Sequence, residues 1–442
     1  MANEKPQIIS KHLIKPSSPT PKRLKTYNLS VLDQLSPRIY FPIVLFYPAL
    51  DSKISCNIKD ISSRLKKSLS ETLTHYYPFA GQISSKDFID CNDEGVDFYE
   101  ALINCELIDI LKKPDSETMD LFSPPGILFN ESFTGSPVII QVTYFKCGGI
   151  ALSVCMSHKV NDAGALYGFI NDWTAVTRGE KVSPIFLTQK IISSLNNGQK
   201  TIPEIKHEKD NVVTRRFSFD PSKLADLKAI IARDDSGTLE INPSRVEVVT
   251  TLLYMCAMAA SKAKTGMSRP SMLIQVVNLR PRVVPPLPEN SVGNFCWSFS
   301  IITNDENDNT MKSIVASLKK AATGFYEKIG NGMTAEKYYS LIGENLEEVR
   351  KVTRENKTSE IESYRCSSWC RYPFSEMNFG WGQPIWVGTF NGKKKNTFTL
   401  MDSVKQGGIN ALVTLEFDKM AIFEKDEELL RFAIMSPNAI GD

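Results

Sequence analysis

One short segment of this 442-residue chain combines a proton-transfer group with a carboxylate. His158 precedes Asp162 by four positions, and the chain has only four histidines, the side chain whose pKa ordinarily lies nearest to neutrality. A histidine acts as a general base when one ring nitrogen faces the substrate and the other is held by a hydrogen bond. The same spacing occurs by chance in many proteins, so a histidine in a surface turn is the competing interpretation.

The sequence around His158 predicts elements rigid enough to hold a general base. Apolar runs at residues 138–145 and 150–156 flank a turn with two glycines, which indicates a β-hairpin. Polar residues and glycines interrupt these runs too often for a membrane-spanning helix. After Asp162, apolar residues spaced three or four apart from Leu166 to Val176 predict an amphipathic helix. His158 would therefore lie between a buried strand and the start of a helix.

Other periodic segments predict a mixed α/β chain. Further helices are expected at residues 60–77, 310–329, 335–352 and 423–435, and further strands at residues 212–219 and 410–417. Ser244 and Glu247 have the spacing of a capping box, which predicts the start of another helix. Between residues 190 and 211 the composition shifts to Ser, Asn, Gly, Lys and Glu without periodicity, which is typical of an interdomain linker.

Composition restricts the class of protein and of partner. A chain of 442 residues is expected to form two or three domains. A net charge of +2 gives no reason to expect nucleic acid or an anionic membrane, so we expect a small-molecule partner and no requirement for a second chain. The nine cysteines lack a disulfide framework, and Cys366 and Cys370 lack the spacing of a zinc site, so we expect reduced thiols, no metal and a cytoplasmic enzyme. No secretory signal is visible at the N-terminus.

A second unusual segment lies near the C-terminus, where two glycines surround a tryptophan. Its residues are Asn378, Phe379, Gly380, Trp381 and Gly382. Together with His158 and Asp162, this segment resembles the paired HxxxD and DFGWG motifs of the plant BAHD acyl-CoA-dependent acyltransferases, in the same order and at a similar distance. Weaker likenesses to that family extend over nearly the whole chain, at residues 76–81, 244–247, 278–282, 290–294 and 400–411.

The resemblance implies a fold and a domain division. It implies an α/β protein with two similar-sized domains of the chloramphenicol-acetyltransferase type, in which helices flank mixed sheets and a solvent channel runs between the domains. The expected N-terminal domain is residues 1–190, joined by about 378–400 from the C-terminal half. Residues 191–211 would be the crossover linker and residues 212–442 the C-terminal domain.

The resemblance also implies roles for individual residues. His158 would remove the proton from the acceptor hydroxyl as its oxygen attacks the thioester of an acyl-coenzyme A, with no acyl-enzyme and so no role for Cys155. Asp162 would point away from the acceptor and pair with Arg280, keeping His158 aligned. Residues 378–382 would shape a turn near the coenzyme A entrance. Asn378 replaces the usual aspartate of that motif, so any ion pair made there in relatives is lost, and we expect activity to survive the change.

Within the family, residues 17–21, 27–30 and 369–374 look most like those of alkaloid O-acetyltransferases. We therefore expect acetyl-CoA as co-substrate, no permanently bound cofactor, and a bulky hydroxylated acceptor such as a monoterpene indole alkaloid. An N-acyltransferase acting on an amine or polyamine and a catalytically silent, metabolite-binding member are the alternatives.

Two further segments allow both a functional and a structural interpretation. Lysines 393–395 could meet the phosphates of coenzyme A or could form a solvated hairpin tip. The aromatic segment 367–374 could line the acceptor pocket or could belong to the core.

Overall fold

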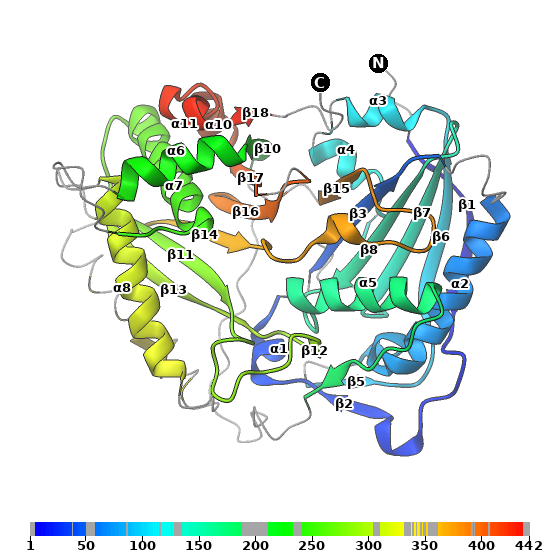
Figure 1. Cartoon of the computed structure of the whole chain (residues 1–442). Coiled ribbons are helices and arrows are strands. Elements are labelled where there is room, and N and C mark those ends of the chain that lie inside the picture. Colours follow the sequence, from blue (N-terminus) through cyan, green and yellow to red (C-terminus); the bar gives the residue numbers. More distant parts are fainter. Residues whose placement is uncertain are drawn as a thin grey trace.

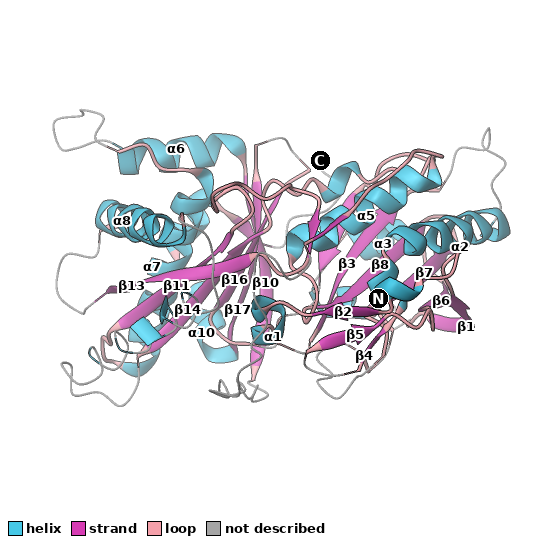
Figure 2. Ribbon diagram, turned by 90° about the horizontal axis from the view of Figure 1, so that it is seen from below, coloured by secondary structure: helices cyan, strands magenta, loops and turns pink. Residues whose placement is uncertain are grey.

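The computed structural model describes residues 5–435 except 38, 50–57, 85–86, 113, 115, 125, 128–134, 188–210, 233–240, 304–309, 331–336, 338–339, 342, 345–346, 348–350, 352–360, 390–391, 393 and 405–406. Two large sheets organise the chain, one of six strands and one of seven (Figure 1). Seen from below, the two sheets stand side by side, and the short helix α1 (Val31–Leu35) lies between them (Figure 2).

The first sheet places the strand that leads to His158 in the interior. β8 (Ile150–Ser157) pairs with β7 (Val138–Phe145) and with β3 (Tyr40–Tyr47), and all three strands are buried along their whole length. The remaining strands are β1 (Gln7–Ile14), β6 (Val96–Ile103) and β15 (Trp386–Thr389), in the order β1-β6-β7-β8-β3-β15. Because apolar side chains fill both faces of β3, β7 and β8, these strands form a rigid platform for the turn that follows β8.

Helices cover both faces of the first sheet. α2 (Ile58–His75) and α5 (Ala163–Thr177) lie together on one face, where the indole of Trp173 donates a hydrogen bond to Ser68. The short helices α3 (Leu107–Leu111) and α4 (Ser116–Asp120) lie on the other face, in an apolar cluster with Val44 and Phe46.

The second sheet runs in the order β13-β11-β14-β16-β17-β10-β18. Its strands are β10 (Val212–Phe219), β11 (Ser271–Asn278), β13 (Cys296–Thr303), β14 (Glu362–Ser368), β16 (Thr397–Asp402), β17 (Ile409–Glu416) and β18 (Ile434–Met435). The helices α6 (Pro221–Ala232), α7 (Arg245–Thr265), α8 (Met311–Ile329), α10 (Phe417–Phe423) and α11 (Glu427–Phe432) lie on the side of this sheet away from the first sheet (Figure 1).

Small elements join the two halves. β12 (Ser291–Val292) pairs with β9 (Ile185–Phe186), so a segment of the second half lies alongside the end of the first. β2 (Thr26–Asn28), β4 (Gln82–Ile83) and β5 (Phe88–Asp90) form a separate three-stranded sheet. Single helical turns occur at Lys22–Leu24, Tyr77–Ala80 and Phe374–Glu376.

The two faces of the second sheet differ in character. Residues such as Leu273, Tyr364 and Phe398 are buried against the helices, whereas their neighbours along β11, β13, β14 and β16 are half-exposed. A hollow lined by Trp386 and Val387 of the first sheet and by residues of β10, β16 and β17 lies between the sheets. The half-exposed face of the second sheet therefore borders solvent-accessible space beside the first sheet.

Most expected elements occur near their expected bounds. The hairpin at 138–157, the helix that follows it, and the strands β10 and β17 all form. The capping box is present, because the Ser244 side chain accepts from the Glu247 N–H and the Glu247 side chain accepts from the Ser244 N–H. The expected linker, residues 191–211, lies outside the described residues except for position 211. Of the helix expected at 335–352, only isolated helical residues are described.

Two expectations need correction. The single helix expected at 423–435 is wrong: α10 ends at Phe423, α11 begins after Asp426, whose side chain accepts from the Leu429 N–H, and residues 434–435 form β18. The segment expected to join the first domain, about 378–400, is too long. β15 does pair with β3, but β16, which begins at Thr397, lies between β14 and β17 of the second sheet.

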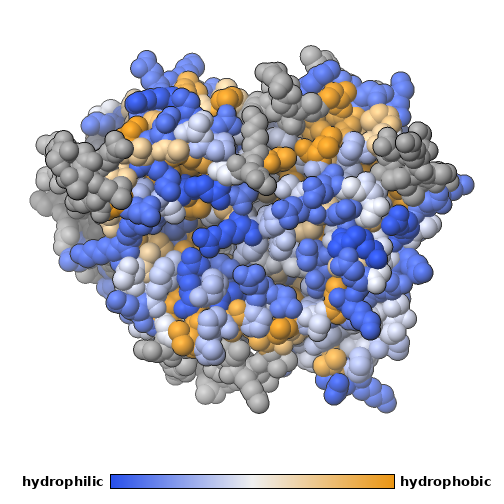
Figure 3. Space-filling model, in the orientation of Figure 1, coloured by the Kyte–Doolittle hydropathy of each residue, from blue (hydrophilic) through white to orange (hydrophobic). Residues whose placement is uncertain are grey.

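One helix meets the length and composition of a membrane span. α7 has 21 residues, but 61% of its most apolar stretch is buried within the protein. It forms the centre of the apolar cluster behind the second sheet, which is the usual place of such a helix in a large α/β domain. On the face shown in Figure 3, hydrophilic residues cover most of the described surface and apolar residues form separate groups.

Candidate active site

His158 lies directly after β8, and its backbone is held on both sides. Its N–H donates to the carbonyl of Ile39 at 2.8 Å, and its own carbonyl accepts from the side-chain amide of Asn294 at 2.9 Å. The imidazole ring lies edge-on to Phe41, with 5.1 Å between ring centroids, and remains half-exposed. These contacts fix the position of the ring and leave part of it accessible.

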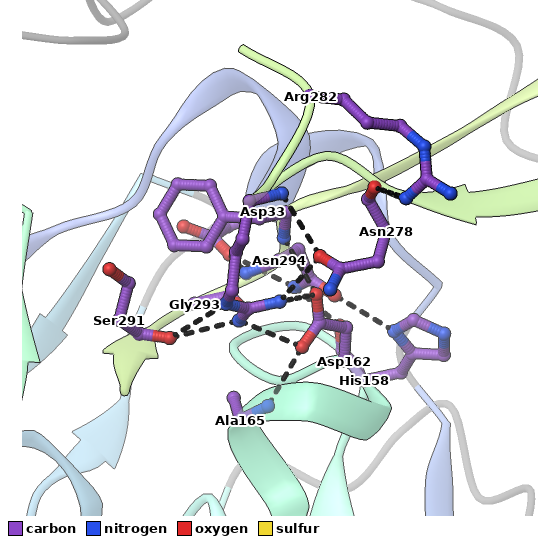
Figure 4. A network of polar contacts seen from close by, with 11 residues as sticks. Asp33, His158, Asp162, Ala165, Asn278, Arg282, Ser291, Gly293 and Asn294 are labelled. Atoms are coloured by element: carbon purple, nitrogen blue, oxygen red, sulfur yellow. Dashed lines mark hydrogen bonds and ion pairs between the residues drawn. The ribbon is translucent and has the colours of Figure 1, made fainter. Parts of the chain in front are cut away.

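Asn294 determines which ring nitrogen of His158 carries the proton. Its Nδ2 donates to Asp33 Oδ1 and to the His158 carbonyl, both at 2.9 Å, so its Oδ1 must face His158 Nδ1, at 3.1 Å (Figure 4). An amide oxygen only accepts hydrogen bonds, so the neutral imidazole is protonated at Nδ1. Its Nε2 then carries the lone pair that a general base requires.

Asp33 holds Asn294 from the other side. Its Oδ1 accepts from the Asn294 backbone N–H at 3.0 Å as well as from the side-chain amide, and its Oδ2 accepts from Ser30 at the start of α1. Asp33 belongs to the first half of the chain and Asn294 to the second, so the orientation of His158 depends on contact between the halves.

The surroundings of His158 keep it neutral. Desolvation lowers the pKa of His158, and the positive charge of Arg365 lowers it further, whereas the negative charge of Asp162 and the hydrogen bond to Asn294 oppose this change. The net effect is a pKa below the ordinary value of 6.5. At neutral pH the ring is therefore mostly in the form that accepts a proton.

Asp162 points away from His158 and toward Arg280. Arg280 Nη1 donates to Asp162 Oδ2 at 2.8 Å and Nη2 donates to Oδ1 at 3.0 Å, a bidentate ion pair (Figure 4). The carboxylate also accepts from the N–H groups of Ala165, in the first turn of α5, and Phe295. All four contacts lie on the side away from the imidazole ring, so the carboxylate serves as the N-cap of α5 and as a connection to the second half.

Arg280 is enclosed almost completely. It is 1% exposed, and besides the ion pair it donates to the carbonyls of Ser291 and Gly293. Burial alone would raise the pKa of Asp162, but the charge and hydrogen bonds of Arg280 hold that pKa below its ordinary value. Both groups are therefore charged at neutral pH, and neither can lose its partner without leaving an unpaired charge in the interior.

Gly164, in the first turn of α5, lies where two side chains approach the helix closely. A Cβ atom at this position would lie 2.8 Å from Arg280 Nη1 and 2.8 Å from the hydroxyl of Tyr372. Gly168, one turn further along α5, faces open space by the same measure. The guanidinium therefore reaches Asp162 only because residue 164 has no side chain.

The motif at 378–382 forms a tight turn. Gly380 and Gly382 have φ angles of +94° and +109°, and both of their N–H groups donate to Asn378 Oδ1, at 2.8 and 3.1 Å. Phe379 stacks on Trp381 and lies edge-on to Trp173, with ring centroids 5.5 and 5.0 Å apart. The amide of Asn378 thus supplies the acceptor that an aspartate would supply.

This turn is not part of the same cluster as His158. Trp173 lies ten residues beyond Ala163, so roughly 15 Å of α5 separates the motif from the helix start next to His158. Arg64 of α2 donates to the Phe379 carbonyl, and Arg178 donates to the Asn378 carbonyl. The contacts of the motif bind it to the outer helices of the first half.

The other candidate segments are divided between the core and the surface. Trp369 and Phe374 are buried in the apolar cluster of the first half, whereas Tyr372 lies half-exposed beside Gly164. Lys395 pairs with Glu416 at 3.0 Å, and Lys393 lies outside the described residues.

Burial raises the pKa of the Cys155 thiol to about 11, so it is not a ready nucleophile. The described residues contain no cluster of His, Cys, Asp and Glu able to hold a metal ion.

Sequence reasoning did not find Asp33 as a site residue and gave Asn294 no role. Asp33 had one local signal, its position three residues after Ser30, which is the spacing of a capping box. Nothing in the sequence near position 33 indicated a contact 261 residues away.

Comparison with known proteins places the whole chain in one family. The model of the Transferase family matches residues 5–430. Akuammiline synthase 1 of Alstonia scholaris is 42% identical, covering 97% of each chain. The 17,18-epoxy-17-hydroxycur-19-ene N-malonyltransferase of Strychnos nux-vomica is 39% identical, covering 98% of this chain and 91% of the relative. Deacetylvindoline O-acetyltransferase of Catharanthus roseus is 36% identical, covering 96% and 97%. The crystal structure of vinorine synthase superposes with a TM-score of 0.83 at 32% identity, covering 99% of this chain and 100% of that one.

Gly164→Ala tests the close approach of Arg280 to α5. The added methyl group would displace the guanidinium or Tyr372, and we expect a loss of about 1–3 kcal/mol in the free energy of unfolding, measured by thermal denaturation. Gly168→Ala is the matched control on the same helix and should be neutral or stabilising by up to about 1 kcal/mol. Equal melting temperatures for the two variants would contradict this description of the site.

Two substitutions with different expected effects on stability test whether the Asn378 side chain accepts from the two glycine N–H groups. Asn378→Asp keeps an oxygen for the two glycine N–H groups and adds attraction to Arg178, so its melting temperature should equal or exceed that of the wild type. Asn378→Ala leaves both N–H groups without their acceptor and should lose about 1–2 kcal/mol. An aspartate variant less stable than the alanine variant would rule out the acceptor role of this amide.

Proposed function

The chain belongs to the BAHD family of acyl-CoA-dependent acyltransferases, and on that premise we propose that it transfers acetyl from acetyl-CoA to a hydroxyl group of an alkaloid. The observation that carries the proposal is the geometry of His158. Its Nδ1 is engaged by Asn294, its pKa is lowered by its surroundings, and its ring is partly accessible at the junction of the two halves.

This geometry supports a mechanism in two proton transfers. His158 Nε2 accepts the proton of the acceptor hydroxyl as the oxygen forms a bond to the thioester carbonyl carbon. The tetrahedral intermediate then expels the coenzyme A thiolate, which receives the same proton from Nε2. The proton thus passes from the alcohol to the thiol, and the histidine returns to its neutral state.

Asp162, Arg280, Asn294 and Asp33 are positioning residues in this mechanism. None of them accepts the proton, because each is engaged by other partners on the side away from His158 Nε2. Their role is to fix the ring and its tautomer, so that no reorganisation is needed when the acceptor binds.

The relatives support the choice of donor and acceptor. Deacetylvindoline O-acetyltransferase is named for acetyl transfer to an alkaloid hydroxyl, and the similarity to it extends over nearly the whole chain. The similarity to the vinorine synthase structure covers nearly all of both chains. We also propose a cytosolic enzyme, since the eight cysteines of the described residues are free thiols, and we propose that it is a monomer.

N-acyl transfer to an amine is the second candidate. It is favoured by the 39% identity to an N-malonyltransferase, a higher identity than that to the O-acetyltransferase. The same histidine could remove the proton from an attacking amine, so the acceptor distinguishes the two functions and the base does not.

Release of free thiol from acetyl-CoA, measured with matched hydroxyl- and amine-bearing alkaloids, tests the proposal. We expect release with hydroxylated acceptors, and His158→Ala should lower kcat/KM by about 10²–10⁴-fold. His75→Ala removes an exposed histidine at the end of α2 that makes none of the contacts of the site, and it should have no effect. Wild-type turnover of His158→Ala would contradict the mechanism, and release with amines alone would replace the O-acyl proposal with the N-acyl one.

The pH dependence has a defined sign. A histidine acts as a general base only when it is neutral, and the pKa of His158 is lowered from 6.5. We therefore expect kcat/KM to be constant at neutral pH and to fall as the pH is lowered, with a midpoint below 6.5. A midpoint above 6.5 would mean that His158 is stabilised in its charged form, contrary to its environment.

A further inference from the structure

A single arginine stands out on the half-exposed face of the second sheet. Arg365 lies in the middle of β14, opposite Ile274 of β11 and Thr397 of β16. Its neighbours Tyr364 and Cys366 are buried against the helices behind the sheet. Because successive side chains of a strand point to opposite faces, Arg365 points to the face beside the first sheet.

The residues around Arg365 on this face are small, mostly hydroxylic and half-exposed. They are Ser298 and Ser300 on β13, Ile274 and Val276 on β11, Ser367 on β14, and Thr397 and Thr399 on β16. None of them carries a charge. The face therefore presents one positive group surrounded by hydrogen-bonding hydroxyls.

The guanidinium of Arg365 has no partner among the residues that the structure describes. No carboxylate forms an ion pair with it, and its side chain makes no hydrogen bond to those residues. The two other enclosed arginines of this region are both engaged. Arg280 pairs with Asp162, and Arg216 donates to the Val387 carbonyl and lies over the Trp386 ring at 4.3 Å.

Arg365 is enclosed by protein and yet not closed off from solvent. Desolvation lowers its pKa, while its side chain keeps part of its accessible surface. Desolvation together with some remaining accessible surface is expected of a side chain that lines an internal, solvent-accessible space. Its charge contributes to the lowered pKa of His158 and opposes the rise that burial causes in the pKa of Cys296, the residue two positions after Asn294. The charge of Arg365 is therefore felt at the proposed base.

Enclosing a guanidinium without a charged partner costs free energy, because nothing offsets the loss of its hydration. A bound anion would offset that cost. A planar guanidinium fits a carboxylate with two parallel hydrogen bonds. Neighbouring hydroxyls such as those of Ser367 and Thr399, which lie opposite each other on β14 and β16, can donate to the remaining lone pairs of the carboxylate. The chemistry of this face thus suits a carboxylate.

We propose that Arg365 binds a free carboxylate of a substrate, so that this enzyme acts on a substrate pair in which one member is an acid. The proposal rests on the acyl transfer proposed above and specifies its substrates, and a carboxylate on the acyl group would replace acetyl-CoA as the donor. The carboxylate belongs either to the acyl group, as in a dicarboxylic acyl-CoA such as malonyl-CoA, or to the acceptor alcohol when acetyl-CoA is the donor. In both cases Arg365 positions the substrate and takes no part in proton transfer.

An experiment with two arms distinguishes a carboxylate on the acyl group from a carboxylate on the acceptor. In the first arm, kcat/KM is compared for malonyl-CoA and acetyl-CoA with the same acceptor. In the second, acetyl-CoA is used with a hydroxylated alkaloid acid and with its methyl ester. We expect the wild type to prefer the carboxylate form about 10- to 100-fold in one arm, since a hydrogen bond to a charged group contributes about 1.5–3 kcal/mol. In Arg365→Gln the ratio of kcat/KM between the acid and the neutral substrate should fall close to one. Arg365→Lys keeps the positive charge but cannot form the two parallel hydrogen bonds, so it should retain part of the preference.

Arg216→Gln is the matched control. It removes another enclosed arginine of the same sheet, but one that already has partners, so the ratio between acid and neutral substrate should stay at the wild-type value. The absence of a preference in both arms of the wild type would overturn the proposal. An equal loss on acid and neutral substrates in Arg365→Gln would also overturn it, since that pattern indicates a structural role.

Calorimetry of the binding of malonyl-CoA, acetyl-CoA, the alkaloid acid and its methyl ester tests the carboxylate site separately from the proposed acyl transfer. If no acceptor releases thiol, the transfer reaction fails, yet a binding preference for malonyl-CoA or for the alkaloid acid that Arg365→Gln abolishes would still support the carboxylate site. Equal binding of acid and neutral forms by the wild type would contradict it whether or not the protein turns over.

Discussion

The buried ion pair between Asp162 and Arg280 is the interaction on which the rest of the site depends. It joins the start of α5 in the first half to a loop of the second half, and four hydrogen bonds to the Asp162 carboxylate are satisfied at once. Because both charges are desolvated, either one alone would be strongly unfavourable, on the order of 3–5 kcal/mol. The pair therefore fixes the turn after β8, and with it His158, to the boundary between the two sheets.

The second constraint is the pair Asp33 and Asn294, which sets the tautomer of the histidine. Burial raises the pKa of Asp33, and hydrogen bonds from Ser30 and Asn294 oppose that rise. Both connections between the halves converge on the segment 291–295, which carries Asn294 and accepts from Arg280. A single short segment of the second half thus holds both the base and its supporting carboxylate. Arg365, on the sheet beyond it, is the enclosed arginine for which the described residues offer no partner.

Much of the fold and part of the site could be predicted from the sequence. Strong apolar periodicity determined β7, β8 and α5, and the position of His158 between them followed directly. The pairing of Asp162 with Arg280 came from the family resemblance, and the structure brings these two residues together. Asp33, the role of Asn294 and the isolation of Arg365 could not be predicted, because each depends on contacts between segments far apart in the chain. The division between α10 and α11 was missed because a local cap at Asp426 outweighed continuous apolar spacing.

Contacts between the halves hold His158 as a neutral base with its proton on Nδ1. Nitrogen NMR of protein labelled at histidine measures this directly, and the chain has only four histidines to assign. The account predicts that His158 is protonated at Nδ1 at neutral pH and titrates with a midpoint below 6.5. A ring protonated at Nε2, or a midpoint above that value, would contradict it.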